Sequence, residues 1–110
     1  ADGVSLGTVP LKSIVANLNE GNMTRYVRCA FVLKLKPNAD AGTVRRIEQS
    51  SVQIKDWMIA FLSEQTIASV KGRDSIRRVC REVTENINRL LGEQAGSPVT
   101  ETLLDEFNIQ

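Results

Sequence analysis

The residues best able to do chemistry in this chain are two cysteines and a group of cations between residues 71 and 81. The 110 residues contain no histidine, which excludes Ser-His-Asp and Cys-His nucleophiles and removes the commonest metal ligand. Two cysteines without histidine cannot complete a closed zinc site. None of the seven glycines belongs to a phosphate-binding loop of the Walker or dinucleotide type. The composition therefore predicts no enzyme, no cofactor and no metal, and favours a binding or assembly domain.

The cations are concentrated in one part of a chain whose net charge is only +1. Residues 63–81 carry a net charge of +3, whereas residues 82–110 carry −5. The cations of the first stretch are Lys71, Arg73, Arg77, Arg78 and Arg81. They surround the start of an expected helix, where the helix dipole is already positive, so each costs about a few tenths of a kcal/mol. Cations kept at such a place are typical of a surface for an acidic partner or another subunit.

The alternative is an ordinary solvated helix face. Arg78 stands four residues before Glu82, and Arg81 stands four residues before Glu85. Pairs at this spacing neutralise each other on a helix surface and contribute little to stability. The sequence leaves both interpretations open.

Cys29 and Cys80 both fall on the apolar faces of their expected elements and could meet in the core. As free thiols they would act as small buried hydrophobic groups. As a disulfide they would indicate an oxidising compartment. Neither has a histidine beside it to produce a thiolate, so we expect no thiol catalysis.

The first third of the chain has the period-two pattern of strands. Residues 9–18 are short, apolar and β-branched, and Pro10 suits a sheet edge or the start of a strand. Residues 26–35 alternate clearly, with Val27, Cys29 and every second residue after them on one face. A turn-rich stretch joins the two segments, which predicts a β-hairpin.

The middle of the chain has the period of helices. Residues 43–62 predict one amphipathic helix whose apolar stripe includes the small residue Ser51. Thr66 is expected to cap a short turn, and a second long helix is expected to open at Asp74 or Ser75 and to stop at Gly92. Its expected apolar positions are Ile76, Val79, Cys80, Val83, Ile87, Leu90 and Leu91.

The last segment, residues 99–110, predicts another strand. Val99, Leu103, Phe107 and Ile109 share one face. Glu101 and Asp105 have the same parity, so either the inner face ends early or a β-bulge shifts the register. The element order predicts a single α+β domain over residues 1–110. A small sheet of three or four strands is covered on one face by two main helices and a short connecting helix.

Membrane and nucleic-acid signals are weak. The longest apolar run has six residues, from Trp57 to Leu62, whereas a membrane span needs about 20. The chain begins at Ala1 rather than Met, so we expect a processed or excised chain that a signal or anchor could precede. Tyr26 is the one aromatic residue that could stack a base on the open face of the sheet, so no nucleic acid is expected.

Several short segments, taken in order, carry a resemblance to a known family. They are Val9–Leu11, Val15–Leu18, Arg25–Val27, Val32–Leu35, Ile54–Asp56, Phe61–Ser63 with Thr66, Lys71–Arg73, Ile87–Asn88, Leu90–Leu91 and Glu106–Gln110. In this order and spacing the chain resembles the periplasmic C-terminal domain of the flagellar basal-body-associated FliL family. It departs from that pattern at Asp74–Ile76 and at Asn108.

The resemblance implies a stomatin-like (SPFH) fold and a non-enzymatic role. It implies a parent protein of the bacterial inner membrane, with one transmembrane helix before Ala1 and this domain in the periplasm at the flagellar basal body. It further implies a homo-oligomeric ring that associates with the stator proteins MotA and MotB and supports torque, motility and chemotaxis. The alternative is a generic stomatin-like membrane scaffold that is not tied to flagella. That Arg73, Arg77 and Arg81 meet acidic residues of the next subunit or of a stator linker is our own hypothesis.

Overall fold

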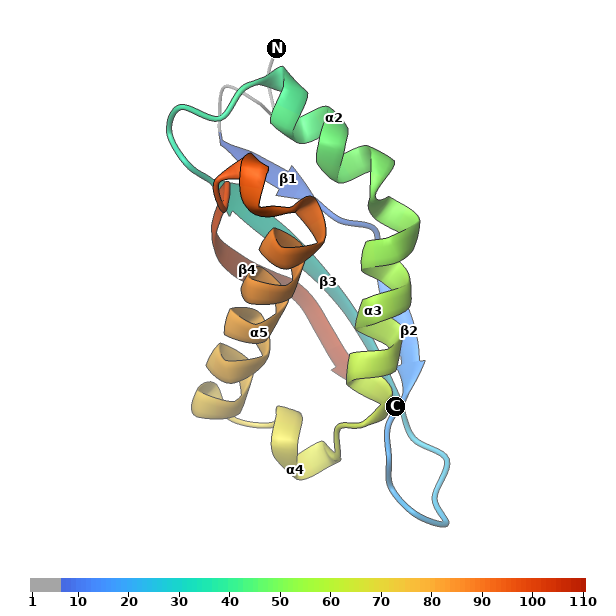
Figure 1. The fold of residues 1–110 in the computed structure, drawn as a ribbon. Coiled ribbons are helices and arrows are strands. Elements are labelled where there is room, and N and C mark those ends of the chain that lie inside the picture. Colours follow the sequence, from blue (N-terminus) through green and yellow to red (C-terminus); the bar gives the residue numbers. More distant parts are fainter. Residues whose placement is uncertain (1–6) are drawn as a thin grey trace.

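The computed structural model describes residues 7–110, which form one antiparallel sheet with helices on one side (Figure 1). The domain is elongated, measuring 46 × 22 × 21 Å. The strands are β1 (Thr8–Pro10), β2 (Ile14–Asn17), β3 (Tyr26–Leu35) and β4 (Val99–Ile109). The helices are α2 (Ala41–Gln49), α3 (Ser51–Ser63), α4 (Ile67–Val70) and α5 (Arg73–Leu91), followed by the 3₁₀ helix η1 (Glu93–Ala95). The predicted α+β class is confirmed.

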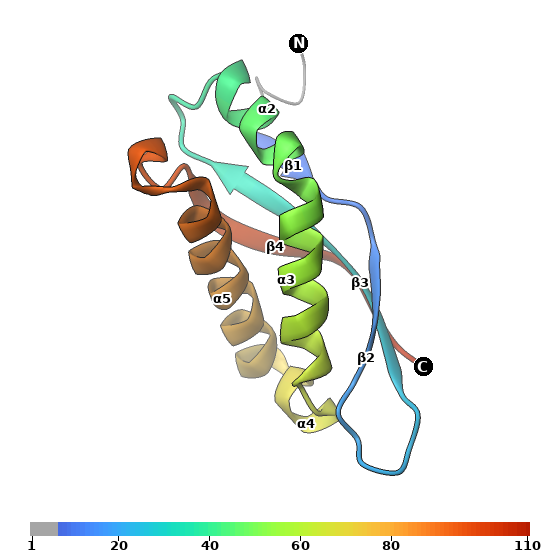
Figure 2. The ribbon, with the colours of Figure 1, turned by 45° about the vertical axis from the view of Figure 1, so that its right-hand side comes forward.

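Strand β3 is the centre of the sheet. It pairs with β4 along one side, from Val27 opposite Ile109 to Leu35 opposite Val99. On its other side β1 and β2 follow each other, so that the sheet is three strands wide. The expected continuous strand over residues 9–18 is therefore wrong. Pro10 lies at a non-hydrogen-bonded position opposite Val32, so its missing N–H removes no bond to β3. Leu11 still donates to the carbonyl oxygen of Phe31 at 2.9 Å, but the register against β3 shifts by one residue before the chain pairs again at Ile14 (Figure 2).

The helix-facing side of β3 carries the centre of the core. Its alternate residues Val27, Cys29, Phe31, Leu33 and Leu35 are all buried, as their alternation predicts. Figure 2 shows α3 and α5 side by side in front of this face, with α4 joining their ends. On the other face Val15, Tyr26 and Leu103 are exposed, and no helix among residues 7–110 covers it.

The helix expected over residues 43–62 is bent. Ser50, with φ −93° and ψ 8°, ends α2 and begins α3. Its N–H is shared between the carbonyl oxygens of Arg46 and Ile47, both at 3.1 Å. The bend lets buried Ile47 and Ile54 both reach the core. Ser51, expected within the apolar stripe, is exposed.

The predictions for α4 and α5 are largely confirmed. The Thr66 hydroxyl accepts from the N–H of Ser69 at 3.1 Å, which caps α4. Helix α5 follows Gly72 and stops at Gly92, whose φ of +91° favours glycine. Four of the expected apolar positions, Val79, Val83, Ile87 and Leu91, are buried. Leu90, expected on the same stripe, is 41% exposed and points away from the core.

Strand β4 contains the expected irregularity. Its register with β3 shifts twice, between Ala30 and Phe31 and between Lys34 and Leu35. These bulges place Leu103 opposite Val32 on the open face, where it is 41% exposed. The expectation that Leu103 shares the inner face with Val99 and Phe107 is therefore wrong, and the bulge explains the conflict of parity.

Candidate interaction surface

The predicted cations follow one another around the start of α5. Lys71 lies after α4, and Gly72 turns the chain with φ +94° before Arg73 opens the helix. Arg73, Arg77 and Arg81 are spaced by four residues, so they form one row along the helix. All three, and Lys71, are exposed. We call these four residues the basic row.

Arg78 is placed differently, because it is half-buried and holds the domain together. Its guanidinium donates to the Glu82 carboxylate at 2.8 Å, to Oε1 of Gln65 at 2.7 Å and to the carbonyl oxygen of Ser69 at 2.9 Å. The bonds to Gln65 and Ser69 join α5 to the end of α3 and to α4. Any contact of Arg78 with a partner would compete with all three.

The two predicted ion pairs of α5 have different outcomes. Arg78 and Glu82 form the expected pair. Between residues 7 and 110 the structure contains no ion pair of Arg81 with Glu85, the other pair expected at this spacing. Asp74 is the one acidic residue in the first turn of α5. The basic row thus faces solvent with little compensation from its own helix.

Both cysteines are free thiols. Cys29 is fully buried, and burial, aided by the charges of Glu106 and Cys80, raises the pKa of its thiol to about 12. Cys80 is half-buried, and burial followed by the charge of Glu101 also raises its pKa. Raised pKa values suppress the reactive thiolate at neutral pH. This arrangement gives neither cysteine the character of a nucleophile.

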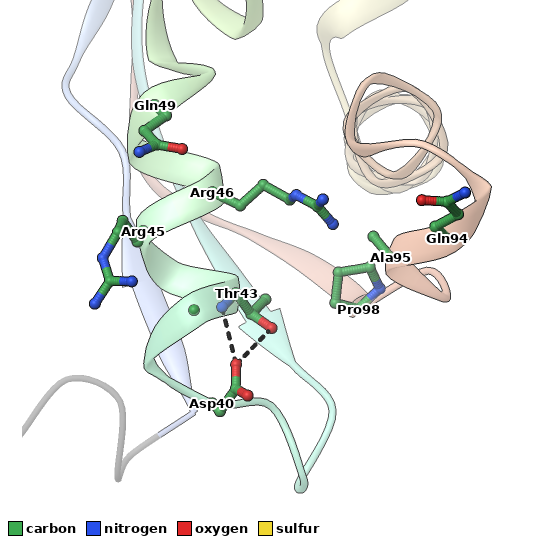
Figure 3. A pocket seen from close by; sticks show the side chains of 9 residues that line it. Asp40, Thr43, Arg45, Arg46, Gln49, Gln94, Ala95 and Pro98 are labelled. Carbon is green, nitrogen blue, oxygen red and sulfur yellow. Dashed lines mark hydrogen bonds between the residues drawn. The ribbon is translucent and has the colours of Figure 1, made fainter.

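The sequence did not predict a polar hollow between α2 and the segment before β4. It has a volume of about 530 Å³, and its lining includes Asp40, Arg46 and Pro98. The Asp40 carboxylate accepts from the N–H of Thr43 at 3.0 Å and from its hydroxyl at 3.3 Å, which lowers the pKa of Asp40 (Figure 3). Arg46 extends across the hollow toward Ala95 and Pro98. Asp40 acts here as the cap of α2, because its oxygen satisfies a free N–H of the first turn.

Two further hollows border the sheet. One, of about 790 Å³, lies between the β1–β2 edge and the α2–α3 helices and is lined mainly by apolar side chains such as Val9, Val52 and Met58. The other, of about 440 Å³, lies between the start of α5 and the end of β4. Each joins segments that are far apart in the chain, so no local pattern could have revealed them.

The hollows offer surfaces rather than reaction chemistry. Within the described part of the chain, no three His, Cys, Asp or Glu side chains are grouped to hold a metal ion. The polar hollow contains one carboxylate, already used as a helix cap, and two arginines.

No helix among residues 7–110 has the length and apolar character needed to cross a membrane.

The comparison with protein families decides the identity. The family described as flagellar basal body-associated protein FliL matches residues 8–110, which is nearly the whole chain. The chain belongs to the FliL family. FliL membership places this domain at the flagellar basal body and gives it a role associated with the flagellar motor and motility. A comparison with curated proteins returns no match.

Proposed function

We propose that this FliL-family domain is a non-enzymatic scaffold of the flagellar motor. It assembles with copies of itself into a ring and associates with the stator proteins MotA and MotB to support torque. The domain works in the periplasm and is held at the inner membrane by a transmembrane helix of the parent protein. Family membership supports the flagellar role over a generic stomatin-like membrane scaffold.

The observation that carries this proposal is the exposed basic row. Arg73, Arg77 and Arg81 lie on one side of α5 at four-residue spacing. Residues 82–110 of the same chain are strongly acidic, so a second copy offers opposite charge at a different place. A contact between two unlike patches is the kind that closes a ring. Steering of oppositely charged surfaces needs no catalytic group.

Crosslinking in cells tests the scaffold role. The membrane-anchored full-length protein is crosslinked in cells that carry the stator proteins and in cells that lack them. We expect products between copies in both strains and products with stator proteins in the first. Absence of both kinds of product would contradict the proposal.

Charge reversal tests the basic row within that experiment. Arg77→Glu with Arg81→Glu should reduce the crosslinked yield about tenfold, since like charges then oppose each other. The melting temperature should stay unchanged, because both side chains are exposed. Arg45→Glu, an exposed arginine on α2, is the matched control and should crosslink normally. Unchanged yield at moderate salt in the double variant would exclude the basic row as the contact.

A further inference from the structure

The outer edge of β4 is closed at one end and open at the other. Near its start, the Asn88 side chain donates to the carbonyl oxygen of Val99 at 2.9 Å and accepts from the N–H of Val99 at 3.0 Å. The side-chain amide of Asn88 thus occupies the backbone groups of Val99 that a neighbouring strand would otherwise bind. Because β4 is an edge strand, its remaining outward backbone groups need another partner or water.

The hydrogen-bond pattern shows which groups at the other end point outward. Tyr26 and Gln110 exchange two backbone hydrogen bonds, of 3.1 and 2.8 Å. In an antiparallel pair such residues alternate with residues that turn their N–H and C=O away from the partner strand. Ile109 opposite Val27 and Phe107 opposite Cys29 are of this second kind. No residue from 7 to 110 accepts from or donates to these outward groups.

The hollow of about 440 Å³ lies beside this open edge. Its apolar lining comes from Ile67 and Val70 of α4, Ile76 of α5, and Phe107 and Ile109 of β4. Gly72, which also lines it, has open space around its Cα, so no side chain fills that corner. An apolar side chain from a strand laid along β4 would enter this hollow.

Positive charge surrounds the same place. Arg25 and Lys71 line the hollow, and Arg73 begins the next helix. The Arg25 side chain also donates to the carbonyl oxygen of Gln110 at 3.0 Å, which fixes it at the end of β4. The acids Asp105 and Glu106 precede Phe107 on the same strand. A bound segment therefore meets cations toward Ile109 and acids toward Asp105.

We propose that the open edge of β4 at Phe107 and Ile109 binds an extended acidic segment of a partner protein as an added strand. The segment pairs with the outward N–H and C=O groups, places an apolar side chain in the hollow, and turns its carboxylates toward Arg25, Lys71 and Arg73. Strand addition of this kind takes affinity from the main chain and specificity from the pockets. The inference deepens the proposed function, on which it rests for the kind of partner.

A two-fold pairing of two copies through this edge is less favourable. Pairing of two β4 strands about a two-fold axis would bring the same cations, Lys71 and Arg73, of both copies to one shared edge. Like charges at such a contact oppose it. The bulge next to Glu106 also limits the regular stretch of β4 to its last residues. The regular stretch of β4 is therefore long enough to pair with one short strand.

Capped synthetic octapeptides test the proposal on the whole chain. Their sequences alternate isoleucine and threonine. One peptide carries two aspartates at its N-terminal end, and another carries them at its C-terminal end. Matched peptides carry two lysines instead, or N-methyl groups on the amides that face β4. NMR titration follows binding, and amide hydrogen exchange reports on Phe107 and Ile109. We expect an aspartate peptide to bind about tenfold more tightly than its lysine and N-methyl counterparts. Binding should slow exchange at these two amides.

Two variants locate the contact. Ile109→Pro removes an outward N–H that β3 does not use and should weaken binding about tenfold, whereas Ile109→Val should bind normally. Lys71→Glu should remove the preference for aspartate. If every peptide fails to bind at about millimolar concentration, or if N-methylation has no effect, the edge is not a strand acceptor. Stator crosslinks in cells would survive that outcome, so failure here is distinguishable from failure of the scaffold role.

Discussion

The hydroxyl of Thr84 on α5 lies 2.7 Å from the hydroxyl of Thr102 on β4. Thr84 also donates to the carbonyl oxygen of Cys80 at 3.0 Å, so its single proton is used and Thr102 is the donor in the pair. Thr102 is only 3% exposed. A buried hydroxyl without a partner costs free energy, and this bond therefore ties α5 to the sheet.

A double-mutant cycle measures this tie. Thr84→Val leaves the Thr102 hydroxyl buried without its acceptor and should lower the free energy of unfolding by about 1–3 kcal/mol. Thr102→Val should cost less, since Thr84 still reaches the Cys80 carbonyl. The double variant should lose less than the sum of the two single changes. Urea unfolding measures all four proteins, and strict additivity would show that the hydroxyls do not interact.

Arg78 and Arg77 are neighbours in sequence with opposite roles. Arg78→Ala removes a hydrogen bond within α5 and two that join α5 to α4 and to the end of α3, so we expect a loss of about 1–3 kcal/mol. Arg77→Ala, on the exposed side of the same helix, should change stability by less than about 0.5 kcal/mol. Thermal and urea unfolding give both values. Equal effects of the two changes would mean that the Arg78 network does not stabilise the domain.

The raised pKa of the Cys29 thiol makes the stability of the fold depend on pH in the alkaline range. Its pKa is raised from 9.0 to about 12 by burial and by the charges of Glu106 and Cys80. The folded protein thus keeps this proton where the unfolded chain releases it. The contribution to stability is complete below about pH 9 and is lost as the pH rises toward about 12. Urea unfolding at successive pH values should show a steeper loss for the natural protein than for Cys29→Ala.

Thiol labelling provides the control for that measurement. In the folded protein at pH 8, half-buried Cys80 should react with a thiol reagent well before buried Cys29. Both should react after denaturation. Rapid labelling of Cys29 in the native state would contradict its burial and the raised pKa together.

Sequence patterns correctly predicted the features that depend only on residues nearby in the chain. The alternation of β3 from Val27 to Leu35 and the stop of α5 at Gly92 are local signals, and both are confirmed. The break after Pro10 and the outward position of Leu103 depend on pairing with β3. Such register effects involve residues far apart in the chain, so periodicity alone could not provide them.

The candidate surface likewise has some features that the local sequence predicts and others that depend on tertiary packing. The four-residue spacing of Arg73, Arg77 and Arg81 is a local signal, and it is enough to predict that they share one side of a helix. The contact of the Arg78 side chain with Gln65 depends on how α4 packs against α5, and the sequence alone does not predict that packing. The open edge at Phe107 likewise follows from the pairing of β4 with β3, which joins distant segments.

The partnership of β3 with the last strand also governs when the domain can form. Every contact from Leu35 with Val99 to Val27 with Ile109 joins segments separated by the entire helical region. Closing so long a loop is slow compared with making a helix. A nascent chain therefore keeps one edge of its middle strand unpaired until residues 99–109 have been synthesised. During that interval the unpaired edge is the part of the chain most exposed to aggregation.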